Sequence, residues 1–145
     1  MKRFVIFSLF WLISLNAFAN PDKAVSRFID SQHKESNTEL VSDTEHGQLI
    51  TFIYLKNTPN EVLVHWVYQV ANFWQHRLTL LRVDGEEFNV LSTIGIEGQV
   101  NSVQLDNKTL LVELLGYGKN DPRCCPTERT TKKYEISNGR ILPIK

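Results

Sequence analysis

From Gly47 onward, apolar and polar residues alternate along the chain, and this period of two constrains the fold more than any other feature. In the run Val62–Val70 the even positions are apolar and would lie on one face of a strand, with the odd positions on the other. Turn pairs such as Asp84-Gly85 and Asn138-Gly139 separate runs of this kind. Their spacing of about 8–12 residues is typical of antiparallel proteins. The pattern therefore predicts an antiparallel meander.

The start of the chain has a different pattern. Pro21 follows Asn20, which can cap a helix, and apolar residues then recur at helical spacing, so we expect one helix from Pro21 to Gln32. Residues 33–46 are polar, without a clean period, and are expected to form a loop that could contain a short strand. The predicted fold class is α+β, with one N-terminal helix packed on a mostly antiparallel β-sheet, a meander. The expected strands are 49–55, 62–70, 75–83, 88–96, a short one around Val103, 109–115 (a central strand buried on both faces), 130–137 and 140–144.

Residues 1–19 have the organisation of a cleaved export signal. Lys2 and Arg3 precede the almost wholly apolar run Phe4–Leu15, and alanines at positions 17 and 19 give the small-residue pattern that signal peptidase requires. The alternative is a membrane anchor, but an apolar run of 12 residues is well short of the ~20 needed to span a bilayer. We therefore expect a signal peptide over residues 1–19 and a single α+β domain over residues 20–145. The expected location is periplasmic or secreted, with no membrane anchor after cleavage.

Charge narrows the class of partner. Two of the 16 basic residues, Lys2 and Arg3, lie in residues 1–19, so the remaining chain has 14 basic and 16 acidic residues and a net charge of −2. This balance argues against a nucleic-acid-binding protein. The charge is uneven, because residues 116–145 contain seven basic and three acidic residues. That end could bind an envelope protein or a small ligand, although a solvated strand face would have the same composition.

The two cysteines of the chain are adjacent, and Cys124-Cys125 is flanked by Pro122 and Pro126. In an oxidising compartment they could form a vicinal disulfide. Neighbouring Cα atoms lie ~3.8 Å apart, below the ~4.4–6.8 Å usual for disulfides, so such a bond would be strained and easily reduced. Two alternatives stay open: two reduced thiols, with or without a bound metal, and thiols that pair between chains or only pack. The prolines restrict the backbone on both sides, so a rigid turn is expected.

The segment Asp121–Thr127, followed by Tyr134, Asn138-Gly139 and Ile141, resembles a motif of small exported bacterial proteins. The motif is the D-P-x-C-C-P-[ST] … [YF] … G-x-[LI] end of the LppP/LprE-like lipoprotein group, and the resemblance covers about the last 25 residues. It implies an exported β-rich domain and names no activity. This chain differs from that group in lacking a lipobox cysteine.

No motif in the sequence indicates catalysis. A nucleophile elbow, an H-E-x-x-H pair and a phosphate loop are all absent from it, and its four histidines have no metal-ligand spacing. His65 and His76 could face each other across a hairpin as two half-buried strand histidines. We expect no catalytic residue, no metal and no cofactor. An aromatic cluster could line a ligand groove but at strand spacing more often belongs to a core; it consists of Trp66, Tyr68, Phe73 and Trp74.

Together these observations predict an exported, non-enzymatic binding protein of unknown ligand, with an envelope inhibitor or an immunity-type protein as narrower forms. The alternative is a thiol-redox protein that uses a vicinal disulfide. The expected site is the cysteine loop with the polar and basic residues beside it. The candidate disulfide residues are Cys124 and Cys125, and the candidate binding residues are Asp121, Arg123, Arg129, Lys132 and Lys133.

Overall fold

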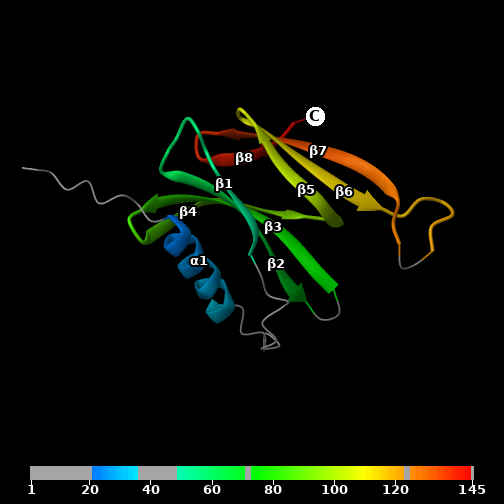
Figure 1. The fold of residues 1–145 in the computed structure, drawn as a ribbon, viewed down its shortest axis with the longest axis horizontal. Coiled ribbons are helices and arrows are strands. Elements are labelled where there is room, and N and C mark those ends of the chain that lie inside the picture. The colour runs from blue at the N-terminus through cyan, green and yellow to red at the C-terminus, as the bar shows by residue number, and fades with distance from the viewer. Residues whose placement is uncertain (1–20, 36–48, 71–72, 123–124, 145) are drawn as a thin grey trace, which may run out of the picture.

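The structure is a computed structural model that describes residues 21–35, 49–70, 73–122 and 125–144. Its strands form two antiparallel four-stranded sheets, ordered β1-β2-β3-β4 and β5-β6-β7-β8. Figure 1 shows the two sheets as layers, with the helix on the outer side of the first sheet. The elements are α1 (Pro21–Glu35), β1 (Leu49–Tyr54), β2 (Glu61–Val70), β3 (Phe73–Asp84), β4 (Glu87–Ile96), β5 (Gln99–Asp106), β6 (Thr109–Gly116), β7 (Glu128–Ser137) and β8 (Arg140–Pro143).

The predicted α+β class, with one helix on one sheet, is wrong. Strands make up 64% of the described residues and form two sheets, so the protein is mostly β. The chain changes sheet after β4: Glu97-Gly98 has the sequence of a hairpin turn, but β5 pairs with β6 and not with β4. Gly98 has a φ of 102°, a conformation that side chains other than glycine rarely adopt. The alternation of apolar and polar residues shows which residues lie on each face of a strand, but not which strands lie beside it. It therefore cannot distinguish one sheet from two.

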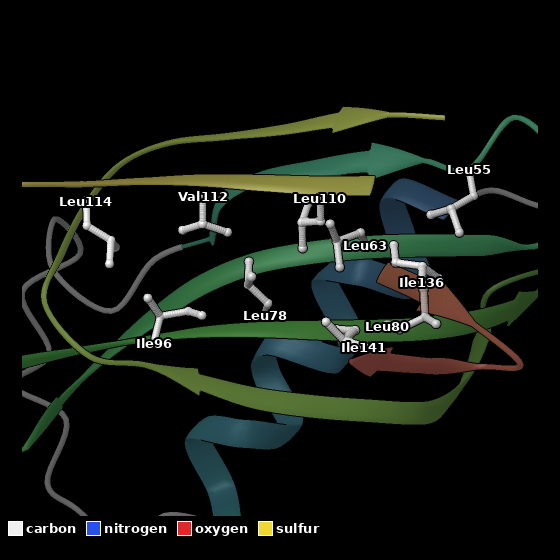
Figure 2. Packing of buried hydrophobic residues seen from close by; sticks show 10 residues of the cluster. All are labelled: Leu55, Leu63, Leu78, Leu80, Ile96, Leu110, Val112, Leu114, Ile136 and Ile141. Atoms are coloured by element: carbon white, nitrogen blue, oxygen red, sulfur yellow. The ribbon is translucent and has the colours of Figure 1, made fainter. Parts of the chain in front are cut away.

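One hydrophobic core lies between the sheets (Figure 2). Leu63, Leu78 and Leu80 from the first sheet face Leu110 and Val112 from the second, and all five are buried. Burial of this apolar surface is the main contribution to holding the two layers together. The buried members of this core are Leu55, Leu63, Leu78, Leu80, Ile96, Leu110, Val112, Leu114, Ile136 and Ile141.

A second core lies between α1 and the other face of the first sheet. Val62, Val64 and Trp66 point to this side while Leu63 points to the first core, as the alternation predicts. Phe28 of α1 packs edge-on against Trp66, with ring centroids 5.7 Å apart and an interplanar angle of 87°. The helix itself extends to Glu35, beyond the predicted end at Gln32. The buried helix residues are Ala24, Val25, Phe28 and Ile29.

The second sheet has an open outer face, which corrects the prediction for residues 109–115. In β6, Leu110, Val112 and Leu114 are buried, but Leu111 and Leu115 are only half-buried because no layer among the described residues covers them. β5 is a full strand and not the short one expected around Val103. The signal peptide predicted for residues 1–19 and most of the loop predicted for residues 33–46 lie outside the described residues. Within the described ranges, no helix has both the length and the hydropathy needed to cross a membrane.

Candidate functional site

The cysteine loop, residues 117–127, connects β6 to β7, and Asp121 joins its two ends. The carboxylate of Asp121 accepts hydrogen bonds from the Gly118 N–H at 2.7 Å, the Thr127 N–H at 2.6 Å and the Thr127 hydroxyl at 2.7 Å. The Thr127 hydroxyl, followed by the two backbone donors, holds the pKa of Asp121 below its usual value, because each of them stabilises the ionised form. Asp121 therefore acts as an acceptor within the loop, and its predicted role in binding stays a prediction.

Of the two cysteines, the structure describes Cys125, which is exposed. Its backbone N–H donates to the Pro122 carbonyl at 3.0 Å, so this part of the loop is folded back on itself. Cys124 and Arg123 lie outside the described residues. The vicinal disulfide and the binding role of Arg123 therefore stay predictions.

The three basic candidates on β7 do not form one cluster. Register with β6 pairs Lys132 with the buried Val112, but Lys133 with Leu111, so these neighbours lie on opposite faces of the second sheet. Arg129 lies on the outer face with Lys133, and its Nη1 is 2.7 Å from Oε1 of Glu113. All three side chains are exposed. Strand geometry thus spreads the predicted basic site over both sides of β7.

What these residues share is the edge of β7. β8 pairs with β7 only from Tyr134 to Ser137, and Figure 1 shows β7 continuing well past it. In the described chain, no strand pairs with residues 128–132 on that side, and Lys133 is bonded there to the Ile144 N–H.

The direction of the free backbone groups follows from two hydrogen bonds. The Ile136 N–H donates to the Lys108 carbonyl on the β6 side, and the Ile144 N–H donates to the Lys133 carbonyl on the β8 side. Backbone groups alternate in direction along a strand, so those of odd-numbered residues of β7 point to the β8 side. The N–H groups and carbonyls of Arg129 and Thr131 therefore face the open edge, whereas Lys133 faces Ile144.

A groove of about 510 Å³ lies where β8 stops. Backbone polar groups beside an apolar wall are the features by which a sheet edge accepts an added strand. Lys132 and Lys133 contribute positive charge to this groove, and Pro143 and Ile144 contribute apolar surface. Its lining residues are Thr131, Lys132, Lys133, Tyr134, Pro143 and Ile144.

His65 and His76 face each other, as predicted. Nε2 of His65 lies 3.0 Å from Nδ1 of His76, on the face of the first sheet that is turned to the second. Burial, and secondarily the neighbouring His76, lowers the pKa of His65 to about 4, and burial lowers the pKa of His76. Both rings are neutral at pH 7, and one donates a hydrogen bond to the other. They form a structural pair in which His65 is buried and His76 is half-buried.

Neither a metal centre nor an aromatic groove emerges from the described residues. No group of three or more histidine, cysteine, aspartate or glutamate side chains among them could hold a metal ion. Trp66 is buried in the helix-side core and donates a hydrogen bond to Thr79 at 2.9 Å, so for this residue the core interpretation is correct. The side chains of Tyr68, Phe73 and Trp74 lie outside the described set.

Sequence reasoning missed two features that the structure assembles. The open edge of β7 depends on where β8 ends, and no residue in β7 signals it. The second feature is a polar pocket at the opposite end of the two sheets, formed by three connections that lie far apart in the chain. The sequence indicates two of these connections, through the turn pairs Asp106-Asn107 and Asn138-Gly139, but not that they meet.

No family model matches the chain, and neither a curated protein nor a solved structure matches it. The resemblance to the LppP/LprE-like group therefore stays a prediction.

Proposed function

We propose that the chain is an exported, non-enzymatic binding protein that takes an extended, acidic segment of a partner protein as an added strand along β7. The observation that carries this proposal is the set of backbone donors and acceptors at Arg129 and Thr131, which face no other described strand and lie beside the groove that Thr131 lines. A peptide in extended conformation would continue the ladder that β8 begins.

The positive charge of β7 favours an acidic peptide. Lys132 and Lys133 are exposed and have no ion-pair partner among the described residues, and they lie on opposite faces of β7. Alternate side chains of an added strand would pass over these two faces in turn, so acidic residues on either face would meet a lysine. Arg129 is already paired with Glu113 and contributes less.

The cysteine loop limits one end of this edge. Glu128, the first residue of β7, follows directly after Thr127, which Asp121 holds through two hydrogen bonds. An ordered connection at this point reduces the conformational entropy lost when a guest strand binds. An inhibitor of an envelope hydrolase and an immunity-type protein are narrower forms of the same proposal.

The test is an affinity measurement with a short synthetic peptide of alternating valine and glutamate. Thr131→Pro removes a donor from the open edge without removing a hydrogen bond to β6, and we expect it to weaken binding by about tenfold or more. Thr131→Val keeps the donor and is the matched control, with affinity expected within about twofold of the original. Equal affinity of the proline and valine variants would contradict the proposal.

A second pair of measurements keeps the test valid if the proline variant unfolds. Lys132→Gln together with Lys133→Gln should weaken binding by about tenfold at low salt, and added salt should weaken binding of the original chain. A peptide with lysine in place of glutamate should not bind. Lysines on an edge strand also discourage self-association. If that were their whole role, both peptides would fail to bind and the double variant would self-associate.

The second candidate is a thiol-redox protein, favoured by one observation: Cys125 is exposed in a loop closed by Asp121. A redox role requires a reducible Cys124–Cys125 bond. Alkylation of protein isolated without reductant should then leave both sulfurs unlabelled and the mass two hydrogens light. Two freely alkylated thiols would exclude this candidate. The variant with Cys124→Ser and Cys125→Ser separates the two functions, since strand addition along β7 should survive it.

A further inference from the structure

A polar pocket of about 320 Å³ lies at the end of the molecule opposite the cysteine loop. β6 connects the two ends, since Thr109 follows the pocket residue Lys108 and Gly116 precedes the loop. The pocket is formed by the β1–β2 connection and by the turns before β6 and before β8. Its volume is at the lower end of the ~300–1,000 Å³ that ligand pockets span, so it suits a small ligand.

The walls of the pocket are held in place by hydrogen bonds. In the β1–β2 connection, the Leu55 N–H donates to the Glu61 carbonyl at 3.1 Å, and the Glu61 N–H donates to the Thr58 carbonyl at 2.8 Å. The carboxamide of Asn57 donates to that of Asn107 at 3.4 Å, which joins the first sheet to the turn before β6. Because these contacts already hold the walls of the cavity, binding would require little ordering.

The charge of the pocket is positive. Lys56 and Lys108 line it, and neither has an ion-pair partner in the part of the chain that the structure describes. Glu61 is the one acidic residue in the lining, and its carboxylate is neutralised by the Arg82 guanidinium at 2.9 Å. That carboxylate is largely buried, with 10% of the side chain exposed. Two unpaired ammonium groups therefore remain, next to a salt bridge that is already satisfied.

The uncharged lining adds hydrogen-bonding groups and an apolar wall. Asn57, Asn107 and Asn138 bring carboxamides, which can both donate to and accept from hydroxyl groups. Leu55 and Ile136 bring buried apolar surface, against which the less polar face of a sugar ring can pack. We propose that this pocket binds a small polyhydroxylated anion, a sugar that carries one carboxylate or phosphate group. The site is separate from the β7 edge and does not depend on the function proposed for it.

The experiment is a titration of the protein with four probes: glucuronate, glucose 6-phosphate, glucose and inorganic phosphate. Binding is measured by calorimetry and by the shifts of amide NMR signals. At least one of the two anionic sugars should bind saturably, with shifts at the carboxamides of Asn57, Asn107 and Asn138. Glucose and inorganic phosphate should each bind at least about tenfold more weakly, because each lacks one half of the recognised chemistry. Which anionic sugar binds more tightly distinguishes a carboxylate from a phosphate.

Three single variants localise the binding. Lys56→Gln and Lys108→Gln should each weaken the binding of the preferred anionic sugar by about threefold to tenfold. Lys119→Gln is the matched control, since this exposed lysine lies in the cysteine loop at the other end, and it should leave the affinity unchanged. The proposal is overturned if neither anionic sugar saturates the pocket, if glucose or inorganic phosphate binds equally well, or if Lys119→Gln weakens binding as much as Lys108→Gln does.

Discussion

Asp121 connects the two ends of the cysteine loop through Gly118 and Thr127. Asp121→Ala removes the acceptor for both backbone N–H groups, so their amide exchange should accelerate by about tenfold or more while the sheets keep their protection. The measurement is residue-resolved hydrogen exchange, with Glu128→Ala as the control in the same region. Unchanged exchange at Gly118 and Thr127 would show that the loop is held by other contacts.

The same carboxylate makes the loop sensitive to acid. The pKa of Asp121 in the folded chain is below its usual value, so its contribution to the loop is present above about pH 3.8 and is lost as the pH falls through the lowered value.

His65 predicts a different dependence on pH. Its pKa in the folded chain is about 4, against ~6.5 when unfolded, so the unfolded chain binds more protons between these values. Stability should therefore be highest above pH ~6.5, decrease by about 1–3 kcal/mol as the pH falls towards 4, and level off below that. Urea unfolding at several pH values measures this. His65→Gln should show a shallower decrease, and an equally steep one in this variant would refute the assignment.

At the scale of helices and strands, the sequence predicts which segments form strands but not which strands are neighbours. The hairpin at Asp84-Gly85 and the faces of residues 62–66 were predictable, because both depend on local chemistry and on a period of two. The change of sheet at Gly98 was not predictable. A turn pair has the same composition whether the next strand pairs with the preceding one or joins another sheet. The open edge of β7 is set by the length of β8, which no residue of β7 encodes.

Gly98 gives this change of sheet a testable cost. Glycine adopts its φ of 102° without strain, whereas alanine would be strained there. No atom lies within 4 Å of the position of an added Cβ, so a substitution would cause no steric clash. Gly98→Ala should therefore destabilise the chain through backbone strain by about 1–2 kcal/mol. Gly95→Ala is the matched control, because Gly95 lies in β4 without a positive φ and has equal space, and it should change stability by less than about 0.5 kcal/mol. Equal effects of the two substitutions in denaturant unfolding would contradict this account of the turn.

At the scale of the whole molecule, we expect the two cores to hold the fold without the cysteines. A bond between adjacent residues closes almost no loop and removes little entropy from the unfolded chain. The variant with Cys124→Ser and Cys125→Ser should lose no more than about 1 kcal/mol, a few degrees in thermal midpoint. Leu78→Ala, in the core between the sheets, should lower the free energy of unfolding by about 2–5 kcal/mol, and it is the reference for a core substitution. A double serine variant that fails to fold would show that the loop is essential for folding.

The two proposed sites lie apart in the molecule, because β6 and β7 run from the polar pocket to the cysteine loop. Asp121 could be identified from the sequence as a loop residue, since its hydrogen-bonding partners are close in the chain. The pocket could not, because its walls come from three connections that only the completed fold brings together. A variant at either site should leave binding at the other unchanged.

The central claim is that the backbone edge of β7 binds an acidic strand, and amide hydrogen exchange of β7 with and without the valine–glutamate peptide tests it most directly. The N–H groups of Arg129 and Thr131 face the open side, whereas those of Thr130 and Lys132 are directed to β6. We predict that the peptide slows exchange at the odd-numbered positions by about tenfold or more and leaves the even-numbered ones little changed. Protection that is equal at odd and even positions, or absent from β7, would contradict the account.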